Sequence, residues 1–392
     1  MSSRKPILLS ILGSLVLSTS FVPSSWANHR TGHFCLPESI VAGDFNEDGN
    51  LDFAVLLTGF DLVAIFIGDG HGGFKLEGHI GVDTLPKGIA VGDVNEDGHL
   101  DLVTCSAWGY TGSVLLGDGL GGFTLVDQPD AGGEATRLVL RDFNEDGHLD
   151  MAMGAHHDGV VHVFAGDGLG AFGVPTDTGK VPNAYGMAVG DFNHDGHLDV
   201  AVARGPAKGA GQVSILLGDG LGGFHLSAFQ TTNDPSSLGV ADLNGDGTED
   251  LVVAGAQPAN TAGNFISTFL GDGAGNFAGH TTIPLGSGNL KGEMAVGDFN
   301  EDGHLDVAYP QTGAGVSQGH TVQLFFGDGT GALGTAVPLP VGTEPHSVMT
   351  GDFNHDGHLD LAVSNRTDGT ISIFLGDGAG HFTLVGTYSV VA

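Results

Sequence analysis

Short hydrophobic runs alternate with acidic or glycine-rich segments along nearly the whole chain. Near the C-terminus, residues 346–351, 359–364, 370–375 and 381–388 form four such runs, with alternating or β-branched apolar residues. This pattern is typical of β-strands that are half-buried in a sheet. No stretch of ten residues has the hydrophobic period of an amphipathic helix, so the sequence predicts an all-β chain.

A nine-residue pattern, Asp-x-Asn-x-Asp-Gly-x-x-Asp, occurs seven times and begins at Asp44, Asp93, Asp142, Asp191, Asp242, Asp298 and Asp352. About 25 residues later each copy is followed by Gly-Asp-Gly-x-Gly-x-Phe, with Leu333 in place of Phe in the sixth copy. These glycines supply the positive φ angles of tight hairpin turns. Four strands in each of seven repeats predict a seven-bladed β-propeller of four-stranded antiparallel blades, spanning residues 38–392. The phenylalanines of both patterns are expected to pack between blades.

The nine-residue loop has the chemistry of a Ca²⁺ site. Positions 1, 3 and 5 can aim side-chain oxygens at one point, and Gly at position 6 permits the sharp turn. Position 7 offers its carbonyl oxygen, and Asp at position 9 completes the shell. The loops contain no cysteine and no invariant histidine, which disfavours a soft metal. The alternative is a solvated Asp/Asn/Gly turn, and seven copies with the same ligand positions argue against it.

The sequence therefore predicts up to seven Ca²⁺ ions. The expected ligands are Asp44, Asn46, Asp48, Asn50, Asp52, Asp93, Asn95, Asp97, His99, Asp101, Asp142, Asn144, Asp146, His148, Asp150, Asp191, Asn193, Asp195, His197, Asp199, Asp242, Asn244, Asp246, Thr248, Asp250, Asp298, Asn300, Asp302, His304, Asp306, Asp352, Asn354, Asp356, His358 and Asp360. The residue at position 7 contributes only its carbonyl, so the histidine rings at this position are expected to be solvated.

The formal net charge is −34, and the aspartates at loop positions 1, 5 and 9 account for 21 of the 46 acidic residues. Much of the acidity is thus assigned to metal ligands. The charge argues against nucleic acid and anionic membrane surfaces as partners.

Residues 1–27 have the features of a secretory signal peptide: Arg4 and Lys5, a mostly apolar run over 7–22, and Ser25-Trp26-Ala27 as a cleavage site. A single membrane anchor is the alternative, and the short, Ser-interrupted run favours cleavage. We therefore expect a secreted, extracellular or periplasmic protein without membrane insertion, in which residues 28–37 lead into the propeller. In such a compartment Cys35 and Cys105 are hypothesised to form a disulfide, the alternative being two separate buried thiols.

The segment Gly351–Val363, Gly-Asp-Phe-Asn-His-Asp-Gly-His-Leu-Asp-Leu-Ala-Val, resembles the core of the FG-GAP/VCBS repeat family. Repeats of this type form integrin α-subunit propellers and some fungal lectins, and the resemblance covers essentially residues 38–392. It implies that the loop joins the first two strands of a blade and holds Ca²⁺. The fifth copy departs most, with Gly245 at position 4 and Thr248-Glu249 at positions 7 and 8, but it keeps its four ligand side chains. The family includes adhesion proteins, lectins and a few enzymes, so it implies a fold and a metal more than an activity.

In a propeller with this topology, the nine-residue loops and the Gly-Asp-Gly turns share one face, here called the loop face. The loops after strands two and four lie on the opposite face, here called the variable face, and differ between repeats. Candidate ligand-binding residues on the variable face are Trp108, Tyr110, Arg137, Tyr185, Arg204, Tyr309 and Arg366.

Aromatic platforms with hydrogen-bonding neighbours suit sugar rings. The further cations Lys87, Lys180, Lys208 and Lys291 favour an anionic ligand. The prediction is a binding or adhesion module for a glycan or a cell-surface protein. The alternative is that the repeat excludes these residue types elsewhere, so that they collect in the variable loops without a binding role.

Two other functions stay open. Glu134, Glu293 and Glu344 are expected near the mouth of the central channel, where paired carboxylates could serve a polysaccharide lyase or hydrolase. A structural protein of an envelope or matrix is the third possibility. No nucleophile motif is present, and the sequence favours binding over catalysis.

Overall fold

A computed structural model describes residues 36–130, 133–155, 159–205, 211–230, 234–256, 263–286, 288–289, 292–313 and 320–391. The chain divides into a unit over 1–33 and a unit over 34–392, and only the second contains described residues. The expected signal peptide, most of the N-terminal lead, Cys35, Lys208 and Lys291 lie outside the described residues.

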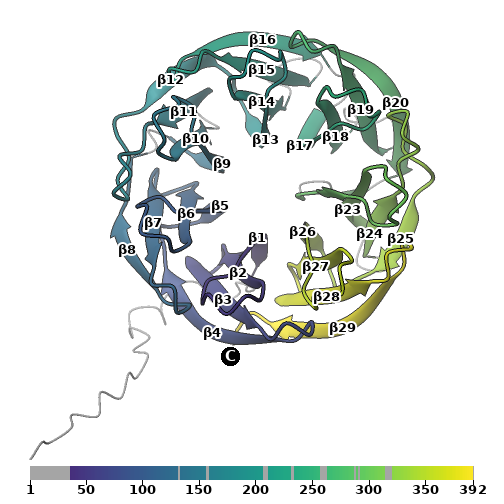
Figure 1. Cartoon of the computed structure of the whole chain (residues 1–392), viewed down its shortest axis with the longest axis horizontal. Coiled ribbons are helices and arrows are strands. Elements are labelled where there is room, and N and C mark those ends of the chain that lie inside the picture. The colour runs from purple at the N-terminus through teal and green to yellow at the C-terminus, as the bar shows by residue number, and fades with distance from the viewer. Residues whose placement is uncertain are drawn as a thin grey trace, which may run out of the picture. The chain divides into compact units, whose positions relative to one another are not determined.

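The second unit consists of seven antiparallel sheets arranged in a ring (Figure 1). The first three blades are β1 (Pro37–Gly43), β2 (Asp52–Leu57), β3 (Leu62–Gly68) and β4 (Phe74–Gly81); β5 (Pro86–Gly92), β6 (Asp101–Ser106), β7 (Gly112–Gly117) and β8 (Phe123–Asp127); and β9 (Ala135–Arg141), β10 (Asp150–Ala155), β11 (Val160–Phe164) and β12 (Thr176–Lys180). The fourth and fifth are β13 (Ala184–Gly190), β14 (Asp199–Arg204), β15 (Gln212–Gly218) and β16 (Phe224–Gln230); and β17 (Asp234–Ala241), β18 (Asp250–Ala256), β19 (Asn264–Gly271) and β20 (Phe277–Gly286).

The sixth blade contains β21 (Gly288–Asn289), β22 (Ala295–Gly297), β23 (Asp306–Gly313), β24 (Thr321–Phe325) and β25 (Val337–Pro340). The seventh contains β26 (Pro345–Gly351), β27 (Asp360–Asn365), β28 (Thr370–Gly376) and β29 (Phe382–Ser389). The strands predicted for the last repeat agree with β26 to β29 within one residue at each end, and the all-β, seven-bladed prediction is confirmed. The sixth blade departs from the pattern because β21 and β22 both pair with β23.

The blades pack against one another through the phenylalanines of the two repeated patterns. Phe45, at loop position 2 of blade one, meets Phe123 of the turn in blade two edge-to-face, with ring centroids 5.4 Å apart. Where the loop residue is Leu243, the partner in the next blade is Leu333 in the same buried cluster. Edge-to-face pairs combine apolar burial with a favourable quadrupole contact. The expected packing role of these residues is therefore confirmed.

The ring closes with the same kind of contact. Phe353 of blade seven meets Phe74 of blade one edge-to-face at 5.6 Å. The Gly72 N–H donates to the Phe353 carbonyl at 3.1 Å, as Gly121 N–H donates to the Phe45 carbonyl at 2.9 Å one blade later. Each sheet is made of consecutive strands, so the described residues of blade one add no strand to blade seven. Closure therefore depends on side-chain packing and interblade hydrogen bonds.

Candidate functional site

The last aspartate of each nine-residue loop ties the loop to the Gly-Asp-Gly turn. In blade one the Asp52 carboxylate is fully buried and accepts the N–H of Phe45 at 2.9 Å and that of Gly68 at 2.8 Å. In blade seven Asp360 accepts Phe353 N–H and Gly376 N–H, both at 2.8 Å. The structure thereby brings loops and turns together on the loop face, as the sequence predicts.

The other polar groups of the loop converge on its interior. In blade one, Asp44 Oδ1 and Asn46 Oδ1 both accept the Asp48 N–H at 3.1 Å, so these two oxygens point to the same place. At position 1 of blades three and four, Asp142 Oδ1 and Asp191 Oδ1 are buried and have no hydrogen-bond partner in the described part of the chain. A buried carboxylate oxygen without a donor is costly unless a cation compensates it.

The pKa values report the same crowding of negative charge. Burial raises the pKa of the Asp199, Asp306 and Asp360 carboxyls to about 6. The aspartates at loop positions 5 and 1 also raise it, whereas hydrogen bonds from the backbone oppose the rise.

Across the described residues, no three Asp, Glu, His or Cys side chains form a ready-made metal site. The additional donors in the loop are Asn and backbone oxygens, so the set remains one of hard oxygens, which fits Ca²⁺.

An interblade series of side-chain pairs surrounds these loops. Loop position 7 of one blade meets position 4 of the preceding blade: His197 Nδ1 lies 2.6 Å from Glu145 Oε1, and His358 Nδ1 lies 2.5 Å from Glu301 Oε1. His99 pairs in the same way with Glu47, and His148 with Glu96. These glutamates raise the pKa of the four imidazoles above its usual range, primarily through the hydrogen bond. The expectation that these imidazoles are merely solvated is wrong. The arrangement of adjacent blades in the propeller places a glutamate of the neighbouring blade beside each of the four.

Positions 4 and 7 of neighbouring blades still form a hydrogen-bonding pair at two junctions where the residues are not glutamate and histidine. Position 4 is a histidine in blades four and seven, and the facing position 7 is then Thr248 or Asn50. His194 Nε2 lies 3.3 Å from Thr248 Oγ1, and His355 Nε2 lies 3.0 Å from Asn50 Oδ1 across the ring closure. This matched exchange between repeats is the sequence signal that could have revealed the pairs.

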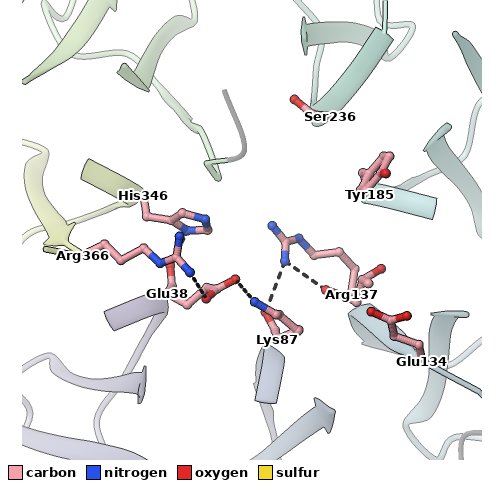
Figure 2. A pocket seen from close by; sticks show the side chains of 9 residues that line it. Glu38, Lys87, Glu134, Arg137, Tyr185, Ser236, His346 and Arg366 are labelled. Atoms are coloured by element: carbon pink, nitrogen blue, oxygen red, sulfur yellow. Dashed lines mark hydrogen bonds and ion pairs between the residues drawn. The ribbon is translucent and has the colours of Figure 1, made fainter. Parts of the chain in front are cut away.

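On the opposite face the repeats diverge. The residue six positions before each loop belongs to the innermost part of the blade, and it differs in all seven repeats: Glu38, Lys87, Thr136, Tyr185, Ser236, Gly292 and His346. Six of these residues line a single cavity of about 360 Å³, together with Glu134, Arg137 and Arg366. Figure 2 shows the charged side chains and His346 turned toward one another on one side of this cavity, with Tyr185 and Ser236 across from them. Because the lining comes from six blades, the cavity is the mouth of the central channel.

Glu38 is the centre of the charged network. Its Oε1 lies 2.7 Å from Lys87 Nζ, and its Oε2 lies 3.7 Å from an Arg366 nitrogen and accepts the Thr58 hydroxyl at 2.9 Å. Burial raises the pKa of the Glu38 carboxyl, but the positive charges of His346 where it is protonated at low pH, of Lys87 and of Arg366 together more than offset it and lower this pKa to about 2. Burial lowers the pKa of His346, whose Nδ1 lies 2.9 Å from the Glu38 carbonyl, so we take its ring as neutral at pH 7.

The remaining cations of the mouth are also paired. Arg137 lies 3.5 Å from Glu293, whose other oxygen accepts the hydroxyls of Ser39 at 2.7 Å and Ser347 at 2.8 Å. Arg366 lies 3.6 Å from Glu344. The expected glutamates are thus at the mouth, but Glu293 and Glu344 neutralise arginines. At the mouth, neighbouring carboxylates thus compensate the charges of Lys87, Arg137 and Arg366, and attraction of an anionic ligand by the wider set of cations stays a prediction.

The aromatic candidates lie in three different environments. Trp108 and Tyr110 are 62% and 51% exposed on the connection between β6 and β7, and Phe60, 38% exposed, lies on the matching connection of blade one. Tyr185 lines the cavity, where burial and the nearby Asp234 and Glu134 raise its pKa.

Tyr309 is completely buried in β23 and is removed from the ligand-binding set, because its ring packs in the core between blades five and six. Sequence reasoning missed Phe60, since a lone phenylalanine in a short loop resembles a packing residue.

Arg204 ends β14, is half-buried, and its pKa is lowered by that burial; it does not line the cavity. Lys180 is exposed at the end of β12.

Cys105 is buried between blades two and three, and burial raises its pKa to about 12. Its pairing with Cys35 remains a prediction, because Cys35 lies outside the described residues.

Comparison with known proteins agrees with this architecture. The sequence matches the FG-GAP-like repeat family over residues 44–104, 142–202, 197–253, 242–309 and 314–363, which together exceed half of the chain. The chain belongs to the FG-GAP-like repeat family. No curated protein matches the sequence significantly. No helix among the described residues is long and apolar enough to cross a membrane.

Several solved structures share the fold of this FG-GAP-like chain at low sequence identity. A lectin from Agrocybe aegerita that recognises non-reducing terminal N-acetylglucosamine is 18% identical, with a TM-score of 0.53 over 86% of this chain and 87% of its own. A candidate 6-phosphogluconolactonase from Bacteroides fragilis is 15% identical, with a TM-score of 0.58 over 92% and 97%. BBS1N, in its complex with ARL6DN, is 10% identical, with a TM-score of 0.57 over 92% and 96%. These likenesses establish the propeller fold alone.

Proposed function

We propose that this protein is a secreted, calcium-stabilised propeller that binds a glycan at the mouth of its central channel. The observation that carries the proposal is the divergence of the seven residues six positions before the loops. Loop positions 1, 3, 5, 6 and 9 are identical in every repeat, whereas this position takes a different residue in each blade. Variation at a cavity on a rigid frame is typical of a recognition site.

The chemistry of the mouth suits a saccharide better than a simple anion. The donors Lys87, Arg137 and Arg366 and the acceptors Glu38 and Glu134 line the cavity. Glu293 and Glu344 pair with the two arginines. A sugar hydroxyl both donates and accepts hydrogen bonds, so paired charges can engage it without a net charge on the ligand. Tyr185 adds an aromatic ring, and a cavity of about 360 Å³ falls in the range of small-molecule sites.

The exposed aromatic residues support an extended ligand. Ala107 N–H donates to the Leu85 carbonyl at 3.0 Å, which holds the loop that carries Trp108 beside the segment leading to Lys87. A glycan chain held at its end in the cavity would extend over this aromatic loop, where pyranose faces can stack.

Binding is favoured over polysaccharide cleavage. A general acid at neutral pH needs a raised carboxyl pKa, whereas Lys87 and Arg366 keep Glu38 ionised. The sugar recognition named for the Agrocybe aegerita lectin supports a glycan ligand by analogy of fold only.

In this proposal Ca²⁺ is held by the Asp and Asn side chains of each loop with the carbonyl at position 7. The bound ion would neutralise the crowded carboxylates and fix the loop. The ion is remote from the mouth and has no part in ligand contact.

A glycan array with the mature chain, followed by calorimetry on the best ligand, tests the proposal. Tyr185→Ala and Lys87→Ala should each weaken binding at least about tenfold, because they remove a stacking surface and a charged donor. Lys75→Ala is the matched control: Lys75 pairs with Glu77 on the outermost strand, so binding should be unchanged.

Binding that survives both mouth substitutions would overturn the site, and the absence of any glycan ligand would overturn the function. Release of new reducing ends or unsaturated products from the same polymers would instead establish the enzymatic alternative.

A further inference from the structure

Three neighbouring blades present an exposed leucine at the same point of the loop face. Leu120, Leu169 and Leu221 lie at the tips of the β3–β4-type turns in blades two, three and four, and their side chains are 80%, 78% and 82% exposed. Single exposed apolar residues are ordinary on protein surfaces. Three equivalent leucines on consecutive blades form a regular arc, which we call the leucine arc.

The turn itself does not require leucine. The equivalent residues in the other blades are His71, Ala274, Thr330 and Ala379. The backbone is the same in both groups: Asp118 Oδ1 accepts the Leu120 N–H at 2.9 Å, and Asp69 Oδ1 accepts the His71 N–H at 2.8 Å. Local structure therefore leaves the side chain free, and the leucines need another explanation.

Acidic loops flank the leucine arc. Gly121, the residue after Leu120, donates its N–H to the Phe45 carbonyl inside the blade-one loop, and Gly170 donates to Val94 in the blade-two loop. Leu120 and Leu169 are thereby held beside the nine-residue loop of the preceding blade, and Gly222, the residue after Leu221, lies close to Asn144 in the blade-three loop. None of the seven loops or seven turns contains Lys or Arg. Even with one Ca²⁺ bound, the three aspartates of a loop leave a charge of about −1, and the loops of blades one to three carry a further glutamate at position 4.

From this alternation of apolar tips and negative loops, we infer that the leucine arc docks a basic, amphipathic polypeptide segment. Its apolar side chains would cover the leucines, and its Lys and Arg residues would meet the acidic loops. The charge disfavours other occupants: an anionic lipid surface would be repelled, and a second copy would place one acidic face against another. The inference uses the loop face only and does not depend on glycan binding at the mouth.

The test uses the mature chain in Ca²⁺ and two peptide probes of about 18 residues made only of leucine and lysine. One has the helical hydrophobic period, and the other has the same composition with the leucines scattered. The variant carries Leu120→Ser, Leu169→Ser and Leu221→Ser, which preserves the charge. The matched control carries Ala274→Ser, Thr330→Ser and Ala379→Ser in blades five to seven.

We expect the wild type and the control to bind the periodic peptide at least tenfold more tightly than the leucine variant does, with an affinity that falls as salt rises. Equal affinity of the leucine variant, equal binding of the scattered peptide, or no binding of either peptide would overturn the inference. So would leucine-dependent binding to phosphatidylserine vesicles without peptide binding, or leucine-dependent self-association measured by light scattering. An unchanged melting temperature of the leucine variant shows that it remains folded.

Discussion

The two faces of this propeller differ in how far their residues repeat from blade to blade. On the loop face, every blade carries the same aspartates, asparagine and glycine, and each final aspartate accepts the same two backbone N–H groups. At the mouth of the channel, seven equivalent positions hold seven different residues. The backbone repeats at both places, so the fold does not impose this divergence. The comparison indicates that the architecture constrains the residues of the loop face, and it supports the proposal that the mouth is the recognition site.

Removal of divalent ions is the strongest way to test this division. Each Ca²⁺ site occupied at 100 times its dissociation constant would add about 2.7 kcal/mol to the free energy of unfolding. With seven such sites we expect EDTA to lower the melting temperature by more than about 10 °C in scanning calorimetry. Restoring Ca²⁺ should recover it, and an unchanged transition would refute the role of the loops as metal sites.

Two substitutions in one loop separate the hydrogen-bonding role of position 9 from metal ligation. Asp360→Ala leaves the buried N–H groups of Phe353 and Gly376 without acceptors, which costs about 1–3 kcal/mol for each group. We expect this loss to persist in EDTA and to be at least as large in Ca²⁺, because Asp360 is also an expected ligand.

Asp352→Ala is the matched control in the same loop. Asp352 is expected to act mainly as a metal ligand, so its replacement should lower stability in Ca²⁺ and much less in EDTA. Denaturant unfolding in both buffers measures the difference, and equal losses for the two variants would contradict the separation.

At the mouth, Glu38→Gln should destabilise the protein by about 3 kcal/mol, because it removes the partner of two partly buried cations. The pKa of Glu38 is lowered from 4.5 to about 2 in the folded state, so its stabilisation is complete above the unfolded value and is lost progressively as the pH falls from there through the folded value. Melting curves of wild type and variant should therefore differ at pH 7 and converge only as the pH approaches the folded value of about 2. The outer-strand variant Glu77→Gln should show no comparable difference, since its pair with Lys75 is exposed.

The smallest expected effect concerns the one junction where loop position 4 has no side chain. Gly245 occupies this position in blade five with a φ of 70°, and four other blades place glutamate there at φ values of 55° to 59°. Gly245→Glu should create the missing pair with His304 and raise the melting temperature by about 1 °C or less, because exposed pairs contribute little. His304→Ala in the same background should remove the gain, and a gain that persists would show that no pair had formed.

The sequence predicted the repeated features well because each one is local. Loop, turn and strand patterns each lie within about ten residues and recur seven times, so chance resemblance averages out. The contact between Glu145 and His197 joins residues 52 positions apart. It follows from the angle between adjacent blades, which no local pattern encodes.

The mouth was predicted in part for a related reason. Lys87, Arg137, Tyr185 and Arg366 are rare residue types in a repetitive chain, and rarity was enough to select them. Whether a rare residue faces the cavity or the core depends on strand register, so Tyr309 was assigned to the surface although its side chain is buried. The pair of Arg137 with Glu293 joins blades three and six, and the pair of Arg366 with Glu344 joins two connections of blade seven, so neither could be read from composition.

The closure of the ring has one more consequence. Blades one and seven meet through the same aromatic pair and the same glycine hydrogen bond as other neighbouring blades, so their junction is built like the others. Circular permutants that open the chain between any two blades should fold to the same wheel, and each sheet can be completed before the next one leaves the ribosome.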